Sequence, residues 1–268
     1  MKTIRPVFKC HGGKFYLAQW IISHFPANYT ELTYVEPYCG GANVLLNKEK
    51  SAIEVISDLD NNIIRIYQAL RDEPKEFIRR LNLCKYCEET FERATKKTKA
   101  ADFDDYLDQA VNEFVIRRMS RGGLKKAFAW SNRLRGGQPG DVNAWMTALK
   151  GLPDLAERLK EVYAFNKPAL EIMKTFNAPN TLVYCDPPYL HETRVSKTVY
   201  SSEMTTDDHI ELSHMLNGFN GKAMISGYMS PLYNRLYKDW NVEKKKISNH
   251  SSQQKTKEKK VEVIWKNY

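Results

Sequence analysis

The sequence predicts an α/β fold built around a mostly parallel β-sheet. Short, largely apolar segments typical of strands recur along the chain, and longer segments with apolar residues at helical spacing lie between them. Strands that alternate with helices indicate parallel strands joined by helical crossovers. With 268 residues, 42% of them hydrophobic, the chain is long enough for one large domain or for a core with an insert.

Strands are predicted at five places along the chain. The first four are short apolar runs that suit a buried sheet. The last has Val261, Val263 and Trp265 in alternation with charged residues, which predicts a half-exposed, antiparallel strand. The predicted strands cover residues 33–36, 53–56, 181–185, 223–226 and 261–265.

Helices are predicted between these strands. The first begins where apolar residues follow a pair of glycines. The second is long and has Ile63, Ile66 and Leu70 at helical spacing. The third has Thr205 or Thr206 as its expected N-terminal cap. The predicted helices cover residues 42–47, 62–83 and 207–216.

The composition changes between residues 84 and 154. This part is helical in pattern and highly charged, with a glycine-rich break at 136–140, so it predicts an insert in the α/β core. A second polar and basic stretch, 244–260, predicts a loop. Cys84 and Cys87 form a lone CxxC and the histidines lack ligand spacing, so no metal site is expected.

Candidate ligand-binding residues follow the first two strands. Gly40 and Gly41, here called the glycine turn, would let backbone approach a ligand closely. Asp58 lies 17 residues beyond Gly41 (58 − 41), near the spacing at which such sheets bind a ribose hydroxyl. These residues indicate a nucleoside cofactor, and the absence of GxGxxG argues against NAD. The alternative is an ordinary glycine-rich turn with a surface aspartate.

The segment after the 181–185 strand, here called the catalytic motif (residues 186–189), suits recognition of an aromatic amine. Asp186 supplies a carboxylate acceptor, and Pro188 fixes the backbone so that the Pro187 carbonyl is a second acceptor. Tyr189 offers a flat face for stacking on a base. Two acceptors on one NH2 group would make its nitrogen more nucleophilic. The alternative is a Pro-Pro strand terminator without chemistry.

These motifs, in this order, resemble those of the Dam-like, class D12 adenine-N6 DNA methyltransferases, and of their alpha group in particular. Residues 8–14 resemble the family's N-terminal motif, which contacts the methionine part of S-adenosylmethionine. Residues 36–41 resemble its cofactor loop, and 57–60 resemble the acidic motif that holds the adenosyl group. The catalytic motif matches outright. The resemblance covers nearly the whole chain.

The resemblance implies a Rossmann-like methyltransferase core, formed by residues 1–83 and 155–268, and a mostly helical target-recognition insert, 84–154. Asp186, Pro187, Pro188 and Tyr189 would act on an adenine flipped out of double-stranded DNA. Cys10 stands where many members have Trp, and Asn166 where members often carry an acid. The implied cofactor-binding residues are Cys10, Lys14, Glu36, Gly40, Gly41, Asp58, Asn166 and Asp186.

Positive charge supports a polyanionic partner. The chain has 41 Lys and Arg against 32 Asp and Glu, and seven basic residues lie between 114 and 140. Phe128 and Trp130 are interleaved with them and could stack where a base has been expelled. The alternative is a solvated basic face with two core aromatics. The candidate DNA-binding residues are Arg121, Lys125, Lys126, Arg133 and Arg135.

Other functions remain open at the sequence level. Cytosine-N4 methyltransferases usually have Ser in place of Asp186, and enzymes that methylate protein glutamine normally have Asn there. An RNA substrate and a non-catalytic DNA-binding protein are further alternatives. No membrane span is predicted, and a reducing cytoplasm, in a bacterium or a phage-infected host, is the expected setting. The DNA recognition sequence and the oligomeric state stay open, and a monomer is a plausible state.

Overall fold

The computed structural model describes residues 3–10, 12–193, 203–247 and 260–268. The chain forms two compact units. The first holds the helix-rich part and comprises Met1–His24, Cys39–Glu49 and Ile56–Asn166. The second holds most of the strands and comprises Phe25–Tyr38, Lys50–Val55 and Lys167–Tyr268.

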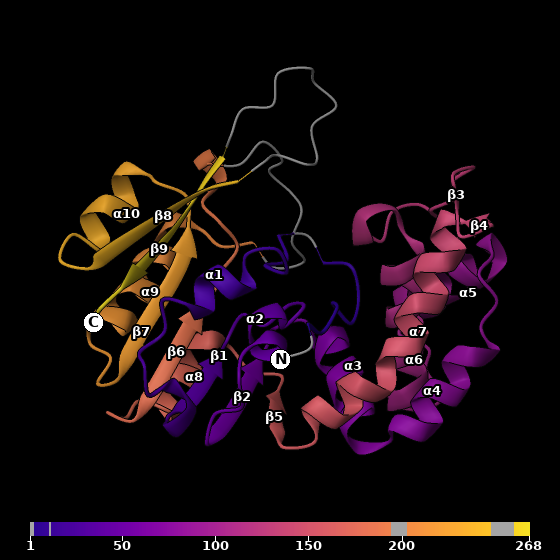
Figure 1. Cartoon of the computed structure of the whole chain (residues 1–268), viewed down its shortest axis with the longest axis horizontal. Helices are drawn as coiled ribbons and strands as arrows, with labels where there is room; N and C mark the ends of the chain where they lie inside the picture. Colours follow the sequence, from indigo (N-terminus) through magenta and orange to yellow (C-terminus); the bar gives the residue numbers. More distant parts are fainter. Residues whose placement is uncertain (1–2, 11, 194–202, 248–259) are drawn as a thin grey trace. The chain divides into compact units, whose positions relative to one another are not determined.

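The larger sheet consists of β1 (Thr33–Glu36), β2 (Ile53–Ser57), β5 (Val162–Phe165), β6 (Thr181–Cys185), β7 (Lys222–Gly227), β8 (Asn241–Ile247) and β9 (Lys260–Lys266). Its strand order is β5-β2-β1-β6-β7-β9-β8. β6 pairs in parallel with β1 on one side and with β7 on the other. β9 runs antiparallel between β7 and β8 (Figure 1). The α/β fold with a mostly parallel sheet is therefore confirmed.

The strands confirm most of the sequence prediction. All five predicted strands are present, and the last is antiparallel as predicted. The prediction that this last strand is half exposed is wrong, because β9 lies inside the sheet and Trp265 is buried against Tyr233. The prediction of a loop over 244–260 is also wrong at both ends, since Lys244 lies in β8 and Lys260 opens β9. Residues 248–259 lie outside the described part of the chain.

The described residues of the second unit include the α-helices α8 (Ala169–Thr175), α9 (Thr206–Asn217) and α10 (Pro231–Leu236). The N-terminal cap of α9 is Thr205, as the sequence predicts. The Thr205 hydroxyl accepts a hydrogen bond from the Asp208 N–H, and the Asp208 carboxylate accepts one from the Thr205 N–H. This reciprocal capping box satisfies two N–H groups that the helix itself cannot pair.

The first unit contains α1 (Ala18–Ile22), α2 (Asn43–Asn47), α3 (Asn61–Asp72), α4 (Pro74–Leu83), α5 (Glu88–Ala100), α6 (Tyr106–Met119) and α7 (Gly140–Leu159). In Figure 1, α3 to α7 gather into one bundle, with α6 packed against α3, α4 and α5. The Phe114 ring of α6 contacts Phe77 of α4 and Trp145 of α7, at centroid distances of 6.0 and 5.7 Å. These rings form the centre of the bundle core.

The single helix predicted over 62–83 is two helices. α3 ends at Asp72, and Pro74 opens α4 at its first position. Proline lacks an N–H and disfavours helical backbone at the preceding residue, here Glu73, so the helix is interrupted there. The short helix predicted at 42–47 is confirmed as α2.

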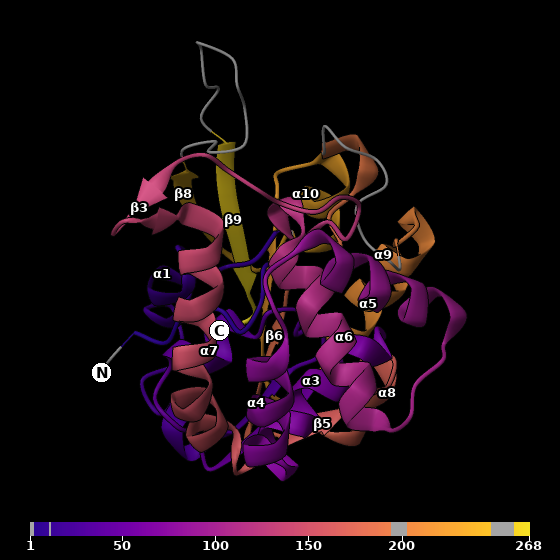
Figure 2. The ribbon, with the colours of Figure 1, turned by 90° about the vertical axis from the view of Figure 1, so that its right-hand side faces the viewer.

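A small hairpin precedes α7. It consists of β3 (Leu134–Arg135) and β4 (Gln138–Pro139), which pair antiparallel (Figure 2). The turn between them is Gly136–Gly137, with φ of 59° and 77°, a conformation that favours glycine at both positions. None of the helices in the described part of the chain is long and apolar enough to span a membrane.

Candidate active site

The glycine turn is fixed by hydrogen bonds from both sides. Gly40 has a φ of 43°, and its N–H donates to the Asp58 carboxylate at 2.9 Å. Its carbonyl accepts from the Tyr67 hydroxyl of α3 at 2.8 Å. The structure therefore brings together two of the predicted cofactor-binding residues, 18 positions apart, and holds the turn in one conformation.

Asp58 follows β2 directly and is partly buried. Its second carboxylate oxygen accepts from the Asp60 N–H at 2.9 Å. Burial raises the pKa of the Asp58 carboxyl, while these two backbone N–H donors act in the opposite direction. Each carboxylate oxygen still has a lone pair for a ligand hydroxyl, because an oxygen accepts more than one hydrogen bond.

The N-terminal motif lies against the glycine turn. A Cβ placed on Gly40 would lie 3.5 Å from the Cys10 sulfur, so the two segments are in close contact. Lys14 is buried, and its ammonium donates to the Gly12 carbonyl at 3.0 Å. Cys10, Lys14, the glycine turn and Asp58 thus form one cluster within the first unit.

Asn166 also belongs to this cluster, although its side chain is exposed. Its amide donates to the carbonyls of Asp58 and Leu59, at 2.9 and 3.1 Å. Asn166 therefore fixes the backbone beside Asp58 through its amide nitrogen, and its amide oxygen remains available to a ligand.

The catalytic motif begins where β6 ends, in the second unit. Asp186 is partly exposed, and its charge is one cause of the raised pKa of Tyr184 and Cys185, after burial. A thiol with a raised pKa stays protonated, and Cys185 packs against Met173. Glu36, at the end of β1, is buried and accepts a hydrogen bond from Tyr34 at 2.9 Å.

Tyr189 is anchored by a residue that the sequence does not single out. Its hydroxyl donates to the carboxylate of Glu262, a residue of β9 that is 2% exposed. Burial, with the charge of Glu262 next in size, raises the pKa of Tyr189 well above its usual value, so the phenol keeps the proton that it donates. The only sequence signal for Glu262 is an acid inside an apolar strand.

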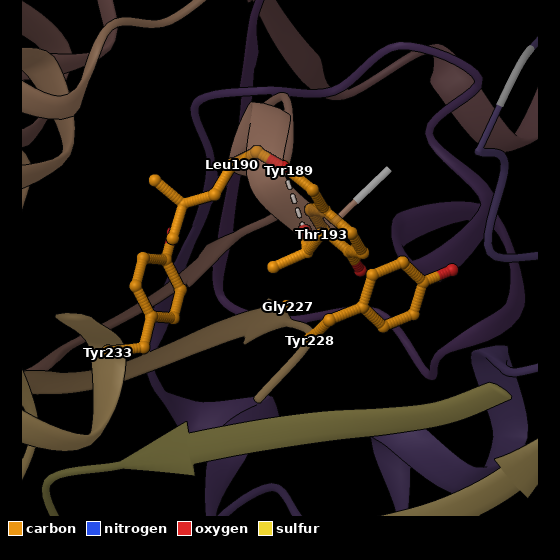
Figure 3. A pocket seen from close by; sticks show the side chains of 6 residues that line it. All are labelled: Tyr189, Leu190, Thr193, Gly227, Tyr228 and Tyr233. Atoms are coloured by element: carbon orange, nitrogen blue, oxygen red, sulfur yellow. Dashed lines mark hydrogen bonds between the residues drawn. The ribbon is translucent and has the colours of Figure 1, made fainter. Parts of the chain in front are cut away.

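A small pocket lies beside the catalytic motif. Figure 3 shows the Tyr189 ring turned towards Tyr228, and the ring centroids lie 4.8 Å apart at an interplanar angle of 80°. Leu190 points away from them, towards Tyr233. Tyr189, Leu190, Thr193, Gly227, Tyr228 and Tyr233 line the pocket.

Comparisons with known proteins place the chain in a family. A family model described as D12 class N6 adenine-specific DNA methyltransferase matches residues 11–256. The chain belongs to this family. The family activity is transfer of a methyl group to N6 of adenine in DNA, and the methyl donor is S-adenosylmethionine.

Bacterial DNA methyltransferases are among the relatives of this D12 methyltransferase. The type II methyltransferase M1.LlaDCHI of Lactococcus lactis subsp. cremoris is 24% identical, over 99% of this chain and 96% of the relative. A DNA adenine methylase of Serratia marcescens is 22% identical, over 90% and 88%. Among solved structures, the rRNA methyltransferase aviRa of Streptomyces viridochromogenes aligns with a TM-score of 0.41 and 12% identity, over 99% and 85%.

The residues of the first unit fit the cofactor of a D12 methyltransferase. A Cβ on Gly41 would lie only 2.9 Å from the Asn43 amide nitrogen, so the turn has room for backbone alone. Backbone without side chains allows close approach of a ligand, and Asp58 beside it offers acceptors for ribose hydroxyls.

The predicted DNA-binding residues differ in their surroundings. Arg121, Lys126, Arg133 and Arg135 are exposed, and within the described ranges none of these four has an ion pair. Lys125 instead contacts Glu113, which is fully buried, at 2.8 Å. The four exposed cations are available to phosphates or bases, whereas Lys125 is already partly neutralised.

A buried ionic cluster, missed by the sequence analysis, links α6 to the acidic motif, residues 57–60. Arg117 of α6 contacts Glu113 at 2.6 Å and Asp60 at 2.9 Å, and all three side chains are at most 8% exposed. Asp60 caps α3 and donates its N–H to Asp58. The guanidinium also lies 5.0 Å from the centre of the Phe8 ring.

Proposed function

We propose that this D12 methyltransferase acts on double-stranded DNA, at a specific sequence, and methylates an adenine that it has flipped out of the helix. The exocyclic amine of a stacked, paired adenine is out of reach of an active site, so the base has to leave the duplex. In this proposal residues 84–154 recognise the target, and residues 1–83 and 155–268 form the catalytic core. The protein acts in the cytoplasm of a bacterium or of a phage-infected host.

The catalytic motif supports this function most directly. Asp186 and the Pro187 carbonyl are two acceptors at the end of a central strand, and Tyr189 is held by Glu262. In the proposed reaction they accept the two N–H groups of adenine N6, while Tyr189 stacks on the base. The nitrogen gains positive charge as it forms its bond to carbon, and the Asp186 carboxylate stabilises that charge.

S-adenosylmethionine, when bound, supplies a methyl group activated by the sulfonium. The glycine turn, Asp58, Cys10, Lys14 and Asn166 would bind it, and the resemblance to the family adds Glu36 and Asp186 as proposed cofactor-binding residues. No covalent intermediate with the protein is needed, because the amine attacks directly. The proton that N6 loses passes to solvent or to a nearby acceptor.

The test is methyl transfer by Asp186→Ala, followed with tritium-labelled cofactor on unmethylated duplex DNA. We expect the turnover rate to fall by about 10²–10³-fold, the range seen when a group that stabilises transition-state charge is removed. Affinity for S-adenosylhomocysteine, measured by calorimetry, should change less. Asp239→Ala removes an exposed carboxylate of the same unit and serves as the matched control.

The substrate part of the proposal is tested with wild-type protein. Label should appear in N6-methyladenine in duplex DNA. It should not appear in duplexes that contain only G·C pairs, or in RNA of the same sequence. Equal rates for Asp186→Ala and wild type, or label in cytosine, would contradict the proposal. Sequencing the methylated bases in DNA from cells that express the chain gives the recognition sequence.

A further inference from the structure

Asn43 has a buried side chain whose hydrogen-bonding groups are unused. It is the first residue of α2 and is 5% exposed. Its carboxamide oxygen is buried without a hydrogen-bond partner, and its amide nitrogen also lacks one among the residues that the structure describes. Buried polar groups are normally paired, so an unpaired carboxamide needs an explanation. The amide offers one acceptor and two donors whichever way its plane is turned.

The carboxamide lies between two segments of bare backbone. A Cβ on Gly41 would lie 2.9 Å from the amide nitrogen, and one on Gly13 would lie 3.2 Å from it. Asn43 therefore touches the glycine turn on one side and residues 12–14 on the other. Lys14 follows Gly13 in the chain and brings a buried ammonium to this segment.

Asn47, one turn further along α2, is an asparagine with a structural role and allows a direct comparison with Asn43. It is 7% exposed, and its carboxamide makes three hydrogen bonds, to Ile4 N–H, Ile4 carbonyl and the Asn43 carbonyl. Its oxygen and its nitrogen are both used within the protein. The carboxamide of Asn43 holds nothing in place, although it is buried to the same degree.

We propose that Asn43 is a further cofactor-binding residue, whose carboxamide binds the α-amino acid end of S-adenosylmethionine. An α-amino acid carries an ammonium and a carboxylate on one carbon. A carboxamide oxygen accepts from the first, and an amide N–H, with the Lys14 ammonium in the same segment, suits the second. Asp58 repels a carboxylate and suits hydroxyls, so it is expected at the ribose end. This inference rests on the proposed role of the glycine turn and Asp58.

Calorimetry with two ligands tests the proposal. S-adenosylhomocysteine has the α-amino acid, and 5′-methylthioadenosine lacks it. Asn43→Leu, which keeps the approximate volume, should weaken S-adenosylhomocysteine binding about tenfold to a hundredfold, as expected for hydrogen bonds to charged groups. Binding of 5′-methylthioadenosine should stay within about twofold. Asn43→Ala, which only shortens the side chain, should show the same selectivity, so the test does not depend on one variant folding.

Thermal unfolding separates this role from a structural one. Without ligand, Asn43→Leu should melt at the wild-type temperature or above it, because it removes an unpaired polar group from the interior. Asn47→Leu, the matched control, should melt lower, because it breaks three hydrogen bonds. A lower melting temperature for Asn43→Leu, or equal loss of affinity for both ligands, overturns the proposal, as does unchanged affinity.

Asp58→Ala distinguishes failure of this inference from failure of the proposed site. Asp58→Ala should weaken both ligands, because both contain the ribose. If it weakens neither, the assignment of the glycine turn and Asp58 is wrong. If Asp58→Ala weakens binding of both ligands while Asn43→Leu weakens binding of neither, the proposed cofactor site is supported and the proposed role of Asn43 is wrong.

Discussion

At the residue scale, Asp58 holds a negative charge where its surroundings disfavour one. Partial burial raises the pKa of its carboxyl, and the N–H groups of Gly40 and Asp60 only partly offset that effect. The carboxylate nevertheless sets the conformation of the glycine turn through Gly40. Its charge state therefore affects the shape of the turn as well as any ligand hydroxyl that it accepts.

Cofactor binding should consequently weaken earlier in acid than an ordinary aspartate would allow. A raised pKa means that Asp58 takes up a proton at a higher pH, and a protonated carboxyl loses an acceptor for Gly40 and for ribose. The dissociation constant for S-adenosylhomocysteine should rise as the pH falls towards this raised pKa. Asp58→Asn should bind about 10–100-fold more weakly at neutral pH, with a flatter pH profile.

Calorimetry across neutral and mildly acidic pH measures both effects. Asp72→Asn, which changes an exposed aspartate at the end of α3, is the control and should follow the wild-type profile. A wild-type profile that is already flat over this range would show that the Asp58 charge does not govern binding.

At the element scale, the sequence predicts what depends on local pattern and misses what depends on distant contacts. Buried strands such as β6 are apolar runs because both faces are covered, and the pattern reveals them. β8 is missed because an edge strand has no such pattern. Its lysines are typical of a protected edge, and the same residues suit a loop.

The candidate site divides along the same line. The catalytic motif is predicted because its chemistry follows from four consecutive residues, and Asp58 because it follows the glycine turn at a spacing typical of such sheets. Glu262 is missed because its partner Tyr189 lies 73 positions away, and Arg117 is missed because Asp60 lies 57 positions away. A charge pattern in the sequence cannot show that such groups meet inside the protein.

Arg117 gives an element-scale prediction. Arg117→Met leaves the buried carboxylates of Glu113 and Asp60 with one cation fewer, so the free energy of unfolding should fall by about 3–5 kcal/mol. Urea denaturation of the full chain measures this change. Arg79→Met, which breaks an exposed ion pair with Glu76, is the matched control and should cost about 0–1 kcal/mol.

A second substitution separates charge from packing. Adding Glu113→Gln to Arg117→Met removes one of the two carboxylates that have lost a cation and should restore part of the lost stability. If Arg117→Met costs no more than Arg79→Met, the cluster does not stabilise the link between α6 and the acidic motif.

At the scale of the whole molecule, the formal net charge is +9, but its cations are not equally available. Arg80 of α4 contacts both Glu76 and Asp105, and Lys97 of α5 contacts Asp108 at 2.8 Å. Segment 121–135, which the structure describes throughout, has exposed cations without ion pairs. These cations are therefore a better guide to the DNA-binding surface than net charge.

The hairpin and the segment before it should separate two roles of positive charge. Arg133 precedes the exposed β3 strand and Arg135 ends it, next to the Gly136–Gly137 turn, and a narrow hairpin of this kind can enter a groove. Replacing either with Ala should relax discrimination at one base pair by about 1–3 kcal/mol. Lys126→Ala should instead weaken all sequences alike and make the salt dependence shallower by about one unit, since a lysine at a phosphate displaces one counterion.

Lys125→Ala is the internal comparison, because it removes a cation that Glu113 already neutralises. It should change the salt dependence less than Lys126→Ala does, while lowering the free energy of unfolding, because Glu113 loses a partner. Methylation rates on single-base variants of the recognition site, at two salt concentrations, measure all four variants together. If all four match wild type on every substrate, DNA is recognised by other residues, and the basic residues of 244–260 become the next to test.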